Sequence, residues 1–294
     1  MLSTLSKALL SLSLLLAFGH SKPISASEEN LFIQGFISQG YIRTTGNDYL
    51  GKTREGSFDF TEATLNLYYR PYDRLYLAGQ LLHRDVGDDP GNYTNLMLDY
   101  LFIGGHLITS EHFEANLKVG RTKIPWGLFH DSRDIPFSHL GILLDQAVYN
   151  DNFRPVILSN SGAKAGLKLL SPLGELTFEW SHPFDLPGSY DDMESEIPSI
   201  PGVFEILDSD TKRLKAARLS YLNPANTMQL SVSWIGGGEN SYRGYYPQVP
   251  GFPPGVSATQ YTEGKNAFWV YSAVYRLNDW QFTAEYYRST AKNR

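Results

Sequence analysis

The sequence EATLNLYY at residues 62–69, followed by RPYDR at 70–74 and LYLAGQLL at 75–82, decides how this chain folds. In the first stretch the odd positions are apolar and the even positions are mostly polar, and in the last stretch most leucines again fall on odd positions. Side chains of a β-strand point alternately to its two faces, so each stretch predicts a strand with one apolar face. The short segment between them, with its proline and aspartate, predicts a tight turn. Together they predict an antiparallel hairpin.

The same alternation returns along the rest of the chain. The opposite faces of these later stretches carry Lys, Glu, Asp and Gln, including an inward Asp99. The stretches 33–44 and 267–276 are less decisive, because apolar residues occur on both of their faces. The apolar positions of the clear stretches are Leu98, Tyr100 and Phe102; Ala115, Leu117 and Val119; Ala165, Leu167 and Leu169; Leu176, Phe178 and Trp180; Met228, Leu230, Val232 and Trp234; and Trp280, Phe282, Ala284 and Tyr286.

The connections between these strands alternate strictly between two lengths. A soluble β-sandwich also has strands with one polar face, but nothing requires it to keep short and long connections in turn. A transmembrane β-barrel has short turns at the periplasmic rim and long loops at the outer rim. The sequence therefore predicts an all-β fold, a transmembrane antiparallel up-and-down β-barrel in a bacterial outer membrane. The tight connections are residues 70–74, 108–112, 171–174, 223–226 and 277–279, and the long ones are 45–56, 85–94, 121–162, 184–212 and 236–265.

The size of the barrel follows from counting the strands. The periodicity predicts about eleven, whereas bacterial single-chain barrels usually have an even number. The chain ends at Arg294 directly after a strand, without the terminal Phe or Trp that is typical of outer-membrane barrels. We therefore expect residues 27–294 to form a barrel that is incomplete at the C-terminus, part of a larger one of roughly 14–18 strands.

The N-terminus and the composition agree with export. Lys7, the apolar residues 8–18 and the small residues 25–27 predict a cleaved signal peptide over residues 1–26. The apolar run is shorter than the roughly 20 residues that a transmembrane helix needs. The net charge of -6 gives no indication of nucleic-acid binding, and with 0 Cys there is neither a disulfide nor a thiolate metal site. Nineteen Tyr and five Trp suit the aromatic girdles of a barrel at the two membrane interfaces.

The longest connection, residues 121–162, is a candidate constriction loop. It contains GRTKIPWGL at 120–128, SRDIP at 132–136 and ILLDQ at 142–146. A connection of this length is usually functional or disordered, and its Ile, Leu and Phe content argues against disorder. A loop that folds inward and packs on the barrel wall accounts for both features, and it would narrow the pore.

This segment, together with GFISQGY at 35–41, resembles the porin-like outer-membrane proteins of Gram-negative bacteria, and more loosely the phosphate-selective porins. The resemblance covers most of the chain after the signal peptide. It implies a diffusion channel, commonly a homotrimer, whose third external loop constricts the pore. The basic ladder characteristic of phosphate selectivity has no match in this chain.

Charged residues at and around this loop are the candidate pore-lining residues. Lysines on the two flanking strands would form a basic wall, and aspartates of the loop would form an opposing acidic edge. Rows of charge set the ion preference of pores, although a lumen-facing charge can also be merely solvated. The candidates are Lys118, Arg121, Lys123, Asp131, Arg133, Asp134, Asp145, Lys164 and Lys168.

Other motifs give weaker indications of function. His130, Asp131 and Ser132 are the residue types of a hydrolytic triad, but adjacent residues cannot usually form its hydrogen-bond chain. Residues 191–196 form an acidic external loop that lacks the ordered ligand spacing of a calcium loop. We therefore expect no catalytic residue, metal or cofactor. We expect a porin in contact with outer-membrane lipid that admits small hydrophilic solutes or ions. The alternatives are an outer-membrane barrel enzyme of the lipase or protease type and a non-conducting structural or adhesive barrel.

Overall fold

The computed structural model describes residues 30–46, 48, 52–86, 93–135, 138, 144, 147–149, 157–184, 205–211, 214–246 and 258–293. Within them, no helix has the length and apolar character needed to cross a bilayer. The described residues include one short 3₁₀ helix, η1 (His130–Ser132). The strands are β1 (Leu31–Ile42), β2 (Ser57–Tyr72), β3 (Leu75–Val86), β4 (Tyr93–Thr109), β5 (Phe113–Lys123), β6 (Ser159–Ser171), β7 (Gly174–Pro183), β8 (Glu205–Thr211), β9 (Lys215–Leu222), β10 (Met228–Tyr246), β11 (Ala258–Leu277) and β12 (Trp280–Asn293).

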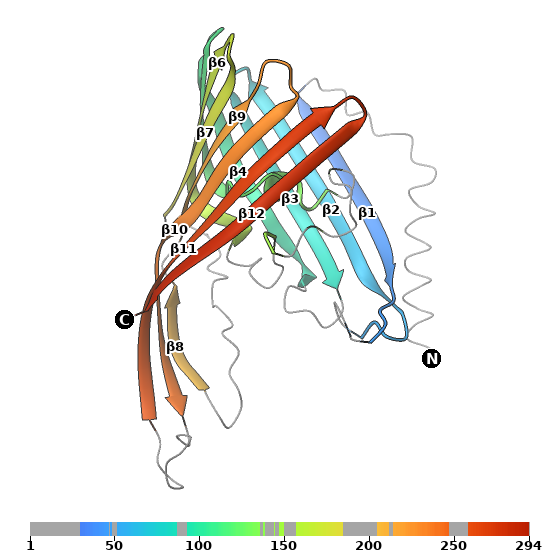
Figure 1. Ribbon diagram of the computed structural model, residues 1–294, viewed down its shortest axis with the longest axis vertical. Coiled ribbons are helices and arrows are strands. Elements are labelled where there is room, and N and C mark those ends of the chain that lie inside the picture. The colour runs from blue at the N-terminus through green and yellow to red at the C-terminus, as the bar shows by residue number, and fades with distance from the viewer. Residues whose placement is uncertain are drawn as a thin grey trace.

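The strands form one antiparallel sheet in which eleven of them follow each other in chain order (Figure 1). β8 is the exception, because β7 pairs with β9 and β8 pairs with the part of β10 that extends beyond β9. The predicted all-β, up-and-down architecture of about eleven strands is thus confirmed, with β8 in addition. Among the described residues β1 and β12 end the strand order and do not pair with each other, so the sheet is a curved and open wall.

The tight turns lie where the sequence predicts them. At the β9–β10 turn, Asn223 Oδ1 accepts hydrogen bonds from the backbone of Thr227 at 2.8 Å and of Met228 at 2.9 Å. Asn226 in this turn and Asn278 in the β11–β12 turn have φ values of 56° and 52°. Asn adopts this left-handed region more readily than other residues that carry a Cβ. The side chains of these turns therefore fix the hairpins.

Two of the predicted long loops are wrong in their bounds. Residues 236–265 are not a loop, because β10 continues to Tyr246 and β11 begins at Ala258. β8 lies within the predicted loop 184–212. Figure 1 shows β8 and the adjoining ends of β10 and β11 projecting beyond the rest of the sheet. This part of the sequence is polar without a clear alternation, so the pattern did not predict strands there.

The two faces of the sheet differ in exposure as the alternation predicts. On the face that we call outer, large apolar side chains are exposed, whereas the opposite, inner face buries polar and charged side chains. Exposed apolar side chains that alternate with polar ones are the pattern of a barrel wall between lipid and a polar interior. Outer-face residues include Leu65, Leu101, Ile103, Leu167, Leu176, Leu219, Leu230, Tyr271 and Phe282, and inner-face residues include Gln80, Lys164, Ser181, Ser233 and Ser272.

The facing of β4 corrects one part of the prediction. Gln80 pairs with Tyr100 and Leu81 pairs with Leu98, which leaves Asp99 as the extra residue of a β-bulge. Paired residues share a face, so Tyr100 joins the buried Gln80 on the inner face. Phe102 pairs with the buried Ala78 and faces inward too. The expectation that Tyr100 and Phe102 share the apolar face of Leu98 is therefore wrong, because the bulge shifts the alternation by one residue.

The predicted loop 121–162 is shorter at both ends, because β5 continues to Lys123 and β6 begins at Ser159. The inner face also carries an apolar core between β9–β11 and residues 124–158, which we call the β5–β6 loop. On the loop side, Trp126 and Tyr149 are almost fully buried. On the wall side, Ala216, Ile235 and Val270 have no exposed surface. This cluster holds the described part of the loop against the wall over several strands.

Candidate functional site

The β5–β6 loop is fixed first by its own buried aromatic residues. Trp126 Nε1 donates a hydrogen bond to the backbone oxygen of Val148 at 3.0 Å. The hydroxyl of Tyr149 lies 2.8 Å from the backbone nitrogen of Leu128 and 2.9 Å from that of Phe129, as their acceptor. Buried Trp and Tyr side chains need such partners for their polar atoms. These hydrogen bonds join the beginning of the loop to its later part, independently of the contacts that the loop makes with the wall.

Glu285 on β12 ties this part of the loop to the far side of the sheet. Its Oε1 accepts hydrogen bonds from Leu128 N at 3.0 Å, from Tyr149 Oη at 3.0 Å and from Ser272 Oγ on β11 at 2.8 Å. Burial and the neighbouring Glu285 raise the pKa of the Tyr149 phenol, so the phenol stays protonated and donates. One wall carboxylate thus connects the loop to two strands.

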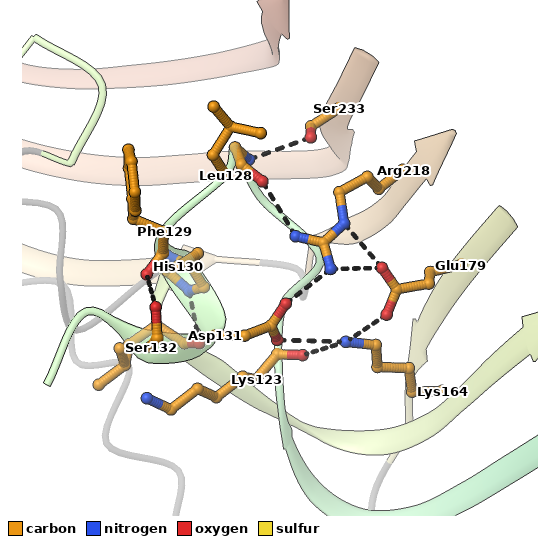
Figure 2. Close-up of polar contacts among 12 residues, drawn as sticks. Lys123, Leu128, Phe129, His130, Asp131, Ser132, Lys164, Glu179, Arg218 and Ser233 are labelled. Atoms are coloured by element: carbon orange, nitrogen blue, oxygen red, sulfur yellow. Dashed lines mark hydrogen bonds and ion pairs between the residues drawn. The ribbon is translucent and has the colours of Figure 1, made fainter. Parts of the chain in front are cut away.

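Arg218 on β9 is the central contact between loop and wall, as Figure 2 shows. Its Nη1 donates to Gly127 O at 2.9 Å, and its Nη2 donates to the carboxylate of Asp131 at 2.6 Å. Its Nε donates to Glu179 Oε2 on β7 at 2.7 Å. Gly127 N in turn donates to Ser233 Oγ on β10 at 3.0 Å. A guanidinium has five N–H donors in a rigid fork, which suits it to hold several acceptors at once.

Lys164 on β6 completes this network of two cations and two carboxylates. Its Nζ lies 2.9 Å from Glu179 Oε1 and 3.5 Å from Asp131 Oδ1. It also lies 3.4 Å from the backbone oxygen of Lys123 (Figure 2). Partial burial raises the pKa of the Asp131 carboxyl, but the Lys164 and Arg218 cations outweigh it and hold that pKa well below its ordinary value. Asp131 therefore stays ionised and joins the loop to β6 and β9.

A second group of charges lies where the loop leaves β5. Lys123 Nζ is 3.1 Å from Asp99 Oδ2 on β4 and 3.0 Å from Asp134 Oδ2 in the loop. All three side chains are buried. Losing one partner of a buried group of charges is costly, because the remaining charge is left without compensation. This group therefore fixes the loop at its start, as Arg218 fixes it farther along.

The remaining predicted site residues lie around these groups. The Nζ of Lys118 lies 5.0 Å from the centre of the Phe102 ring, a cation–π contact on the inner face. Arg121 Nε donates to the backbone oxygen of Asp99 at 3.2 Å, and Arg133 Nη2 donates to that of Tyr149 at 2.9 Å. Lys168 pairs with Glu175 of β7 at 3.2 Å. Asp145 and the acidic residues 191–196 lie outside the described residues.

The structure thus brings the predicted basic and acidic residues together, but in direct contact. Lys164 meets Asp131, and Lys123 meets Asp134, instead of facing each other across a gap. Sequence reasoning missed four of the partners as site residues. Three of them, Asp99, Glu179 and Glu285, were already on the predicted polar face, so a rule that pairs charges across that face could have found them. The fourth, Arg218, lies on a strand whose pattern was not delineated.

The His130-Asp131-Ser132 run makes separate contacts. His130 Nε2 lies 2.8 Å from the backbone oxygen of Leu158, and Ser132 Oγ bonds Phe129 O. Figure 2 shows these contacts together with that of Asp131 to Arg218. Burial, and next the Arg133 cation, lower the pKa of His130 to about 3, so the imidazole is neutral. In the part of the chain that is described, no three acidic or histidine side chains gather as metal ligands would.

No protein-family model matches this chain, and no curated protein matches it either. Among solved structures, the chain is similar to OmpT, an outer membrane protein of Vibrio cholerae. The trimer form of in-vitro folded OmpT is 8% identical with a TM-score of 0.31, covering 89% of each chain. A second structure of in-vitro folded OmpT is 8% identical with a TM-score of 0.32, covering 92% of this chain and 90% of that one. A loop L8 deletion mutant is 9% identical with a TM-score of 0.26, covering 90% and 92%.

At these TM-scores the likeness carries no argument, so the assignment rests on the chain's own sheet. Antiparallel strands in chain order, tight turns at one rim and an exposed apolar outer face are the features of an outer-membrane β-barrel wall. The inner face, covered in part by the β5–β6 loop, is the candidate site.

Proposed function

We propose that this chain forms the wall of an outer-membrane porin, through which small hydrophilic solutes or ions diffuse passively past the β5–β6 loop. The observation that carries the proposal is the attachment of this loop to the inner face. It contacts β6 and β9 through Asp131, β10 through Gly127 and β12 through Leu128. A loop attached to several strands of a wall occupies the interior of the closed barrel and narrows it.

The paired charges give this loop a structural role in the proposed pore. Ions in direct contact attract each other strongly and present little net field to a passing solute. The network of Asp131, Lys164, Glu179 and Arg218 carries no net formal charge. The loop therefore sets the width of the passage, and charges outside the network set its ion preference.

Reconstitution of the purified full-length protein into planar bilayers tests the proposal. A porin gives stepwise current increases with an ohmic conductance, and reversal potentials in a salt gradient report its ion preference. Protein that inserts into the bilayer without conducting refutes the porin function and leaves a structural or adhesive barrel. The homotrimer that the resemblance implies is tested separately, by cross-linking and by sedimentation in detergent.

A further inference from the structure

A polar recess of about 220 Å³ lies on the inner face beside the β5–β6 loop. It extends from Gly127 and Asp131 of the loop along β7, β9 and β10 towards their tight turns, as far as Glu175 and Gln229. One water occupies about 30 Å³ in the liquid, so the recess has room for a small organic molecule. Its charged lining residues are Asp131, Glu175, Glu179 and Arg218.

The cations at this recess are already engaged with the protein. Each of the three nitrogens of Arg218 donates to a protein oxygen, namely of Glu179, Gly127 or Asp131. Lys164, directly behind the lining, has three oxygens within 3.5 Å, from Glu179, Asp131 and the backbone of Lys123. An anionic solute therefore meets cations whose donors are largely in use.

The acceptors at the recess remain accessible. The side chains of Asp131 and Glu175 are 44% and 30% exposed. Glu175 is paired with Lys168, which is itself 35% exposed. A pair as open to water as this contributes little, so a solute cation can replace Lys168.

Ser231 gives a second, independent indication of a ligand. It lines the recess and is only 9% exposed. Within the described part of the chain its buried Oγ has no hydrogen-bond partner. A buried hydroxyl without a partner is unfavourable, so a polar group that enters the recess gains from meeting it.

We infer that this recess binds small solutes that carry a primary ammonium group, with Glu175 and Ser231 as two of its contacts. The inference rests on the proposed porin function, in which solutes reach the inner face from water. An ammonium group has three donors and no acceptor, which suits a lining that offers carboxylates and a hydroxyl. The recess would therefore make passage of such solutes saturable and favour them over carboxylates.

The test uses n-butylammonium as the probe, with n-butyrate and n-butanol as matched solutes of opposite and no charge. Full-length protein in planar bilayers is titrated with each, and block of the current is recorded. Butylammonium is expected to block saturably. Glu175→Gln is expected to weaken the block by up to about fivefold, since an open ion pair is lost, and Ser231→Ala about two- to tenfold. Glu114→Gln, on β5 and outside the recess, is the control for loss of a carboxylate.

Calorimetric titration of the detergent-solubilised protein separates this inference from the porin function. Binding of butylammonium that Glu175→Gln weakens and Glu114→Gln does not supports the recess even if the protein does not conduct. A conducting protein on which butylammonium acts equally in wild type, Glu175→Gln and Ser231→Ala overturns the inference and leaves the porin. Stronger binding of butyrate than of butylammonium overturns it as well.

Discussion

Arg218→Met removes the side chain on which attachment of the loop most depends, and keeps much of its volume. Two of the lost contacts join loop to wall, at 2.9 Å to Gly127 O and 2.6 Å to Asp131. We assign about 1.5 kcal/mol to the partly buried contact with Gly127. Because Asp131 is 44% exposed, its pair with Arg218 is counted at no more than about 1 kcal/mol.

The loop should therefore lose about 1.5–2.5 kcal/mol of its attachment, which raises the ratio of released to attached loop about 10- to 70-fold. Asp131 keeps its contact with Lys164, and Glu285 still holds Leu128, so release is expected to be transient. Single-channel recording should show more frequent excursions to a higher conductance level. The strand pairing is unaffected, and the heat-induced shift in electrophoretic mobility should change little.

The matched control is Arg276→Met, on β11 near the tight turns. Arg276 donates hydrogen bonds to Gln281 and to the backbone of Asn226, and it has no hydrogen bond or ion pair to the described residues of the loop. It should leave the current noise unchanged. If Arg218→Met and Arg276→Met give the same dwell times as wild type, Arg218 does not hold the loop, and the account of the constriction is wrong.

Three further changes test other parts of the structure. Gly120→Ala should prevent assembly, because Gly120 has a φ of 137° and an added Cβ would lie 2.3 Å from Leu101 O. Gly105→Ala is the control and should assemble, because the nearest atom to its added Cβ would be Arg74 O at 3.7 Å. Heat-modifiable electrophoresis reports assembly of both variants. Leu219→Arg on the outer face should destabilise the protein in lipid by about 2–4 kcal/mol, whereas Ser220→Arg on the inner face should not. Denaturant titrations in liposomes measure both variants. Equal losses of stability would contradict the assignment of the two residues to opposite faces. Attachment of the loop should weaken as the pH falls below about 6.5, because His130 binds a proton when the loop is released but not when the loop is attached, where its pKa is about 3. The loss of attachment is about 2 kcal/mol at pH 5. Current noise that does not change with pH would count against this prediction.

The hairpins were predictable where the two faces of a strand meet different surroundings. β2 and β3 alternate clearly, because Leu65 lies on the outer face while Thr64 and Gln80 are buried on the inner one. β11 was ambiguous for a physical reason that the structure supplies. Its inward Val270 and Val274 are buried, and Val270 belongs to the core beneath the loop, so both faces of this strand are apolar.

The facing of β4 could not be predicted from its period alone. The bulge at Asp99 adds one residue, and a shift of one residue sends every later side chain to the opposite face. The ends of β10 and β11 were missed for a different reason, because they project beyond the rest of the sheet and their sequence does not alternate clearly between apolar and polar residues. Periodicity predicts a strand only where the two faces of the strand meet different surroundings.

Most charged residues of the site were predictable as inner-face positions, but Arg218 and the pairing of the charges were not. Lys118, Lys164 and Lys168 all lie on inner-face positions flanking the loop, as the alternation indicates. Which carboxylate each lysine meets depends on how the loop packs on the wall, as with Asp131 for Lys164 and Asp134 for Lys123.

The three lysines therefore differ in what they contribute to ion preference. Lys164 is buried between Asp131 and Glu179, so its charge is largely compensated at short range. Lys168 shares its charge with Glu175. Lys118 lies over the Phe102 ring and, within the part of the chain that is described, has no carboxylate at ion-pair distance. An uncompensated charge acts over a longer distance than a paired one, so among these three lysines Lys118 makes the main basic contribution to the field of the proposed pore.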